Sequence, residues 1–186
     1  MTGTTSRLVT AEELFRMPDS NTRRELIRGV IHDRPLAGWR HARLASNGLF
    51  AVDDHVYRRG MGEVVGPAGF LLERAPDTVL APSFAFVAVG RWTPPARYED
   101  DFYFEGAPDL AGEVASDARS AADMPARVTR WLGAGTRVVL VIDYDCVTAT
   151  VYCSGSQPAE LGVDEELDLS DLVPGMHVPV RHLFER

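Results

Sequence analysis

The sequence predicts an α/β fold in which helices flank a mixed β-sheet. Three observations predict this class: nearly continuous apolar runs typical of covered central strands, a long segment with helical apolar spacing, and a strand, helix, strand succession over residues 110–143. A helix that connects two strands of one sheet makes those strands parallel, and the handedness rule places them side by side or nearly so.

Length and composition fit one domain. The chain has 186 residues, of which 45% are apolar and 25% are charged. A chain of this length buries a sizeable core without metal or disulfide bonds. We therefore expect a single domain over residues 1–186, with its core at about residues 8–184.

A short helix, a strand and a long helix are expected first. Thr10 and Glu13 form a capping-box pattern, so a helix should begin there and end near Met17, before a proline. Residues 25–32 predict a strand that is kinked or turned near Gly29. Residues 39–59 predict a helix, because their apolar residues recur at the spacing of one buried face.

Several short strands and a loop should follow. Residues 63–66, 70–73 and 78–80 are strand candidates, with a turn signal at 75–77. Residues 83–89 form an apolar run that indicates a central strand covered on both faces. Residues 92–105 contain many prolines, tyrosines and acids and predict a loop, and long loops beside a sheet often carry functional residues.

The strand, helix, strand unit contains the best functional clue. Residues 110–116 predict a strand with Glu113 near its centre, residues 121–132 a helix, and residues 137–143 a second buried strand. Metal-dependent nuclease cores present a ligand from such a central strand position. A turn at 144–146 should lead into an antiparallel strand at 147–153, and residues 167–169 begin the C-terminal tail.

The charge balance limits the kinds of partner. A formal net charge of −8 argues against tight nonspecific nucleic-acid binding by the whole surface, because such affinity comes from lysines and arginines that displace counterions. Nucleases are not excluded, since phosphodiesterase sites are themselves acidic. The arginines at 23–24, at 40 and 43, and at 58–59 either form a local basic face or are solvated surface charges.

The termini and cysteines indicate a soluble, cytoplasmic protein with no membrane partner. The N-terminus lacks an apolar signal core, and the longest aliphatic run, residues 138–142, is too short to span a bilayer. Cys146 and Cys153 flank a predicted strand that separates them by roughly 20 Å. A disulfide bond joins Cα atoms at most about 7 Å apart, so we expect two free thiols.

An ordered set of short motifs resembles a known family. The chain carries, in order, the motifs Glu25-Leu-Ile-Arg-Gly29, His41, Gly-Glu-Val-Val at 62–65, Ala81-Pro82, Glu-Gly-Ala-Pro-Asp-Leu at 105–110, Glu113-Val-Ala-Ser116, Asp123, Gly135 and Asp143. This succession resembles the Uma-two-like restriction endonucleases of the PD-(D/E)xK nuclease superfamily. The resemblance implies a restriction-endonuclease-like core, DNA as substrate, Mg²⁺ or Mn²⁺ as cofactor, and a homodimer.

The resemblance also implies a set of site residues. In the family, an aspartate after a proline and a glutamate in the next strand bind the metal. A lysine on the following helix and an N-terminal glutamate complete the set. By position these become Ser83 and Glu113 as metal ligands, Arg127 in place of the lysine, and Glu25.

Two of these four positions depart from the family pattern. Ser83 offers a neutral hydroxyl where a carboxylate is expected, so metal affinity should fall. Arg127 keeps a positive charge but does not deprotonate near neutral pH. It could still hold a phosphate or stabilise developing negative charge. We therefore expect a degenerate site with weak or no activity.

Other readings of these residues stay open. Arg127 lies four residues after Asp123, so the two could instead form a surface pair on one helical face. Glu25 is either a third acid of the site or a surface strand carboxylate. His41 either approaches a phosphate or is structural.

Two aspartates are alternative metal ligands. Pro108 and Asp109 spell the PD motif, but Asp109 stands four residues before Glu113, about 13 Å along a strand. Magnesium ligands lie about 2.1 Å from the ion, so this pair should not share one, and Asp109 should orient the turn instead. Asp77 could replace the missing acid only if its hairpin folds back toward Ser83.

Two classes of function remain. The first is a magnesium-dependent DNA endonuclease of the Uma-two-like family with a degenerate site. The alternative is a noncatalytic nuclease-fold module that binds nucleic acid or a protein partner. A homodimeric structural protein without a nucleic-acid role is a third possibility, for which the acidic balance is mild support.

Overall fold

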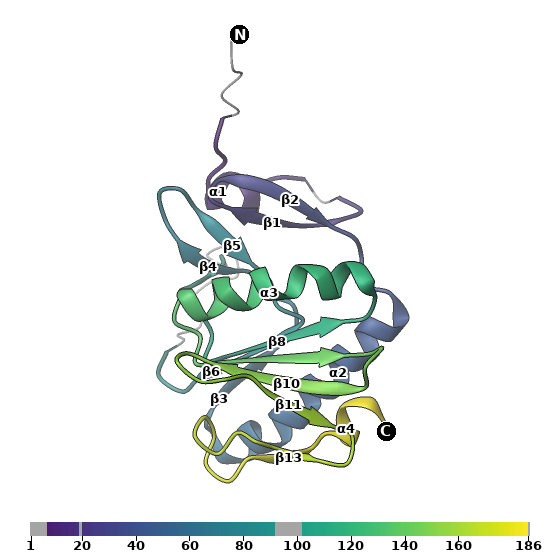
Figure 1. The fold of residues 1–186 in the computed structure, drawn as a ribbon. Coiled ribbons are helices and arrows are strands. Elements are labelled where there is room, and N and C mark those ends of the chain that lie inside the picture. The colour runs from purple at the N-terminus through teal and green to yellow at the C-terminus, as the bar shows by residue number, and fades with distance from the viewer. Residues whose placement is uncertain (1–6, 19, 92–101, 186) are drawn as a thin grey trace.

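Helices flank two main β-sheets in the computed structural model, which describes residues 7–18, 20–91 and 102–185 (Figure 1). The elements are α1 (Ala11–Phe15), β1 (Arg23–Ile27), β2 (Val30–Arg34), α2 (Trp39–Val56), the 3-10 helix η1 (Tyr57–Arg59), β3 (Gly62–Val65), β4 (Phe70–Glu73), β5 (Thr78–Leu80), β6 (Phe84–Ala88), β7 (Phe104–Glu105), β8 (Leu110–Ala115), α3 (Ala118–Gly133), β9 (Val138–Asp143), β10 (Thr148–Cys153), β11 (Ala159–Gly162), β12 (Glu166–Asp168), β13 (His177–Pro179) and α4 (Arg181–Phe184). The predicted α/β class is confirmed.

The strands form one five-stranded sheet, one six-stranded sheet and a two-stranded ribbon. Their orders are β2-β1-β5-β4-β7, β11-β10-β9-β8-β6-β3 and β12-β13. In the six-stranded sheet β8 and β9 are parallel neighbours joined by α3, and β10 pairs antiparallel with β9. Both pairings agree with the sequence-based expectation.

Helices α2 and α3 cover opposite faces of the six-stranded sheet. Val52 and Val56 of α2 belong to a buried cluster with Phe84 and Ile142 of the sheet. On the other face, α3 buries Met124, Val128 and Trp131 in a cluster that also includes residues of the five-stranded sheet. Helix α3 therefore lies between the two sheets, as Figure 1 shows, and residues on its buried face can reach both.

Close packing at two glycines fixes how α2 lies on the sheet. A Cβ atom at Gly112 of β8 would lie 2.2 Å from the Phe84 ring, and one at Gly48 of α2 would lie 2.5 Å from the same ring. Phe84 is fully buried. Its ring thus occupies the space that both glycines leave, and Gly112 directly precedes Glu113 in β8.

The segment predicted as one strand at 25–32 is a hairpin. Arg28 and Gly29, with φ of 50° and 78°, form the turn between β1 and β2. Two residues with positive φ suit the two-residue turn of a tight hairpin. The expected turn at Gly29 is confirmed, but the strand continues to Arg34.

The bounds of some elements differ from the predicted ones. Helix α3 begins at Ala118, three residues before the expected start, because the Asp117 carboxylate accepts a hydrogen bond from Ser120 N at 2.8 Å. In the predicted loop at 92–105, residues 92–101 lie outside the described part, and β7 (Phe104–Glu105) pairs parallel with β4.

The cysteines agree with a further expectation. Cys146 and Cys153 are both free thiols. Over the described residues, none of the helices combines the length and the apolar character that crossing a bilayer requires.

Candidate functional site

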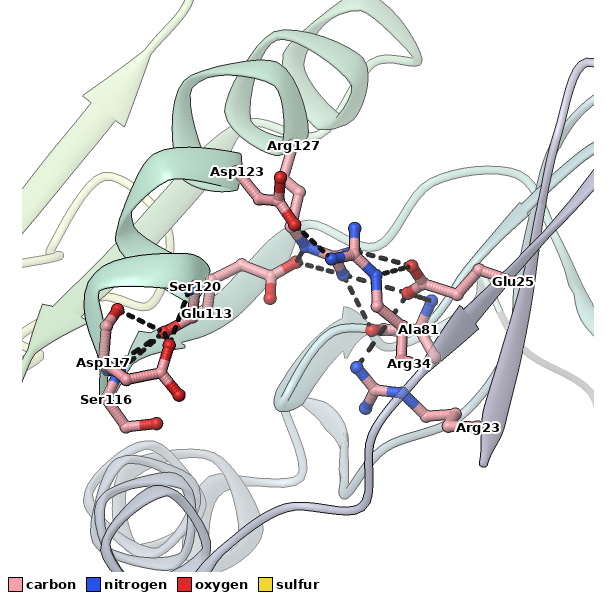
Figure 2. Close-up of polar contacts among 10 residues, drawn as sticks. All are labelled: Arg23, Glu25, Arg34, Ala81, Glu113, Ser116, Asp117, Ser120, Asp123 and Arg127. Carbon is pink, nitrogen blue, oxygen red and sulfur yellow. Dashed lines mark hydrogen bonds and ion pairs between the residues drawn. The ribbon is translucent and has the colours of Figure 1, made fainter. Parts of the chain in front are cut away.

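A buried ion cluster lies where α3 passes between the two sheets (Figure 2). It joins Arg127 of α3, Glu113 of β8 and Glu25 of β1, whose exposed fractions are 5%, 3% and 0%. Three of the four residues that the family resemblance singled out therefore come together. The interpretation of Glu25 as a surface strand carboxylate is wrong.

The guanidinium of Arg127 bridges the two glutamates. Its Nε donates to Glu113 Oε1 at 2.9 Å, and one terminal nitrogen donates to Glu25 Oε2 at 2.7 Å. The other terminal nitrogen donates to Glu25 Oε1 at 3.1 Å and to the carbonyl of Ala81 at 2.9 Å. All three guanidinium nitrogens are thus hydrogen-bonded inside the protein.

The electrostatics of the cluster favour its ionised form. Burial alone raises the pKa of Glu25, but the charge and hydrogen bonds of Arg127, together with Ala81 N and Arg23, lower that pKa to about 2. Burial alone lowers the pKa of Arg127, but Glu113 and Glu25 raise it above its ordinary value. At neutral pH, Glu25 is therefore a carboxylate and Arg127 a cation.

Trp131 also binds Glu113, which the sequence did not lead us to expect. Its indole Nε1 donates to Glu113 Oε1 at 2.6 Å, and the side chain is fully buried. Trp131 lies four residues after Arg127, so the two share one face of α3. That spacing was the available signal, and it directs two donors at the same carboxylate oxygen.

Ser83 lies beside the cluster and bonds with His41. Its N–H donates to Gly112 O at 2.8 Å, next to Glu113, while its hydroxyl lies 3.1 Å from His41 Nε2. Burial lowers the pKa of His41, and Arg23 lowers it further, so the imidazole is neutral at neutral pH.

Two further arginines surround Glu25. The Nε of Arg34 donates to Glu25 Oε2 at 3.0 Å, and its NH1 donates to Asp123 Oδ2 at 2.6 Å. The alternative surface pair of Asp123 with Arg127 is therefore wrong. A terminal nitrogen of Arg23 lies 4.0 Å from Glu25 Oε1, and burial lowers the pKa of Arg23. Arg34 was missed because its role depends on the turn of the hairpin.

The two alternative aspartates are structural. Asp109 Oδ2 accepts hydrogen bonds from Ala88 N at 2.8 Å and from Arg91 at 2.7 Å, which confirms that it orients the turn before β8. The carboxylate of Asp77 accepts from Ala11 N at 2.8 Å and from Ala75 N at 3.0 Å. Asp77 thus binds the first turn of α1 and does not replace Ser83.

The oxygen ligands that the cluster offers do not fit a magnesium ion. Mg²⁺ needs oxygen ligands in near-octahedral geometry at about 2.1 Å. Here both oxygens of Glu25 and one of Glu113 already accept N–H groups, and a guanidinium lies between the two carboxylates. Within the described ranges, no three His, Cys, Asp or Glu side chains form a group able to hold a metal ion.

A cleft opens beside the cluster. Its volume is about 310 Å³, and its lining includes Arg23, Arg34, His41, Glu113 and Arg127. The loop between β2 and α2 and the first turns of α3 complete its walls. The cluster is therefore accessible from solvent on one side.

The comparisons with known proteins agree with this fold. The model of the Uma2 family, described as "Putative restriction endonuclease", matches residues 11–181. The chain belongs to the Uma2 family. A solved structure similar to this Uma2 chain is the crystal structure of a putative nuclease of DUF820 from Anabaena variabilis. The two chains are 19% identical, with a TM-score of 0.79 over 95% of this chain and 97% of that one. No curated protein matches the sequence.

Proposed function

We propose that this Uma2 chain is a nuclease-fold protein that binds nucleic acid and has little or no metal-dependent cleavage activity. The observation that carries this proposal is the Arg127 bridge between Glu113 and Glu25, with contacts of 2.7 to 3.1 Å. Membership of a family described as restriction endonucleases supports nucleic acid as the ligand.

The bridge acts against metal-dependent hydrolysis in two ways. First, the guanidinium neutralises the carboxylates that would otherwise attract a divalent cation. Second, arginine keeps its proton near neutral pH, so it cannot serve as the neutral amine or general base that a lysine can become. Ser83 has a neutral side chain, so it adds no negative charge that would attract a divalent cation in their place.

Displacement of Arg127 by a metal ion is also costly. Arg127 would lose its ion pairs with Glu25 and Glu113 and its hydrogen bond to the carbonyl of Ala81. A metal that displaced Arg127 must offset this cost as well as the dehydration of the ion. The apparent affinity for magnesium should fall accordingly.

The family description favours the competing function, metal-dependent DNA cleavage. Plasmid nicking in magnesium or manganese separates the two functions. We expect no nicking by the wild-type protein above the level seen with Glu113→Gln. Nicking that Glu113→Gln abolishes would contradict the proposal.

Restoring the family pattern gives a positive control. The double variant Ser83→Asp with Arg127→Lys supplies a second carboxylate and a lysine, so we expect nicking that depends on both Glu113 and the metal. Ser83→Asn with Arg127→Lys has nearly the same side-chain size but lacks the carboxylate, and it should stay inactive.

A further inference from the structure

The cleft beside Arg127 is lined by both polar and apolar residues. Arg23, Arg34 and His41 are among the polar ones, and Leu36, Pro67 and Met124 are among the apolar ones. A cavity of about 310 Å³ lies at the lower end of the range for small-ligand sites. This combination suits a molecule that is anionic at one end and flat and apolar at the other.

We propose that this cleft binds a single unpaired nucleotide of a nucleic-acid strand, with its phosphate against Arg23 and Arg34 and its base against apolar lining residues. The inference rests on the proposed function, because it assumes that nucleic acid is the ligand. It specifies the substrate class as single-stranded nucleic acid.

Arg23 supplies the cation for the phosphate. Its Nε is buried and has no hydrogen-bond partner among the described residues. The carboxylate nearest to it, Glu25, already accepts hydrogen bonds from Arg34, Arg127 and Ala81 N. Figure 2 shows the Arg23 side chain extending toward the middle of the drawn cluster. The Arg23 side chain as a whole is 33% exposed and lines the cleft, so a phosphate in the cleft can contact the exposed part of this cation.

Two of the three acids that line the cleft, Glu113 and Asp123, are paired with arginines and so oppose an anion less than their number suggests. Glu113 accepts from Arg127 and Trp131. Asp123 accepts from Arg34, and Asp117 accepts from Ser120 at the start of α3. Arg119, an exposed residue of α3, also lines the cleft and adds positive charge.

An exposed aromatic residue directly follows a lining residue of the cleft in the sequence. Trp39, the first residue of α2, is 84% exposed, and Leu36, which lines the cleft, is 72% exposed. Gly38, between them, also lines the cleft. Bases of single strands stack on such side chains with little dependence on sequence, whereas paired bases are not available for stacking. The size of the cleft likewise admits one nucleotide and excludes a duplex.

Fluorescence anisotropy with labelled oligonucleotides tests the inference. The probes are a single strand and a blunt duplex of the same sequence, titrated with the full chain at about 50 mM salt, where phosphate contacts are strong. We expect the single strand to bind at least about ten-fold more tightly, because base stacking adds to the phosphate contacts. Equal affinity for both probes would overturn the assignment.

Two pairs of variants locate the binding. Arg23→Gln should weaken single-strand binding by about ten-fold and reduce the salt slope by about 0.7, the value for one phosphate contact with a single strand. Arg24→Gln is the matched control, because Arg24 is the next residue of β1 and donates to Pro18 O outside the cleft.

Trp39→Ala should weaken binding by at least about five-fold. Its control is Tyr57→Ala, which removes an aromatic ring that is 80% exposed beyond the far end of α2.

The outcomes distinguish this inference from the proposed function. If neither probe binds, both the nucleic-acid role and the cleft assignment fail. If the probes bind but Arg23→Gln and Trp39→Ala behave as their controls do, nucleic-acid binding stands and only the cleft assignment fails. Trp39 is exposed, so its variant should fold even if Arg23→Gln does not.

Discussion

At the scale of single residues, Arg127 determines what the site can do. Its charge lies between two buried carboxylates that belong to different sheets, so it joins the sheets and, in our proposal, keeps a divalent cation from binding these carboxylates. Buried charges are stable only when they are paired and hydrogen-bonded. The same ion pairs should therefore stabilise the folded protein and oppose metal binding at the site.

Arg127→Met should destabilise the protein strongly. The variant leaves Glu25 and Glu113 buried without their shared cation, and we expect a loss of about 3–5 kcal/mol in the free energy of unfolding. Urea denaturation followed by circular dichroism measures this loss. Arg119→Met removes an exposed arginine from the same helix and should change stability by less than about 0.5 kcal/mol. An Arg127→Met protein as stable as the wild type would contradict the pairing.

Glu25 should make stability depend on pH in the acid range. Its pKa is about 2 in the folded protein against an ordinary value of 4.5, so its stabilising contribution is fully present above pH 4.5. That contribution is lost as the pH falls toward 2, and the size of the shift corresponds to about 3 kcal/mol.

Urea denaturation at pH 5 and at pH 2.5 measures this contribution. The wild type should lose more stability between the two pH values than Glu25→Gln does, because the variant has no carboxylate to protonate at this position. Parallel losses in the two proteins would show that Glu25 is not held as a carboxylate by Arg127.

The sequence was informative about the identity of the site residues and uninformative about their contacts. The family pattern pointed to Glu25, Glu113 and Arg127, and all three are in the cluster. Their pairing could not be predicted, because Glu25 and Arg127 are separated by 102 residues and lie on different elements. The position of Ser83 beside the cluster likewise depends on how two strands pair.

At the scale of elements, close packing of α2 on the sheet positions β8. The Phe84 ring fills the space above Gly112 and below Gly48, so β6, β8 and α2 meet at one side chain. Glu113 follows Gly112 in β8. A shift of that strand should therefore move the carboxylate relative to Arg127.

Gly112→Ala should destabilise the protein by about 1–3 kcal/mol, because the new methyl group would overlap the Phe84 ring. Chemical denaturation measures the effect, and Phe84→Leu in the same chain should recover part of it. Gly133→Ala at the end of α3 is the control, since a Cβ atom there meets no heavy atom within 4 Å. The packing account fails if Gly112→Ala is as stable as Gly133→Ala.

Elements whose own residues show a clear periodicity or apolar run were predictable. Elements whose bounds depend on contacts between residues distant in the sequence were predicted less well. Residues 39–59 and the unit at 110–143 have clear periodicity or apolar runs, and both are present. The start of α3 was missed because Asp117 and Ser120 were not recognised as a cap. A turn near Gly29 was predicted and is present, whereas the extension of β2 to Arg34 was not predicted.

At the scale of the whole molecule, the division of strands into two sheets could not be predicted. The order β2-β1-β5-β4-β7 brings together segments that are far apart in the chain, and no local pattern specifies it. The ion cluster exists because α3 lies between these sheets. Four arginines also line the cleft beside it, in a protein with a net charge of −8. A homodimer and a cytoplasmic location stay predictions.

Manganese binding tests the central claim most directly, because the claim is that Arg127 takes the place of a divalent cation. Isothermal titration calorimetry at pH 7 should detect no Mn²⁺ binding to the wild type at millimolar concentrations. The double variant Ser83→Asp with Arg127→Lys should bind the ion. Binding of Mn²⁺ to the wild type that Glu113→Gln abolishes would contradict the account.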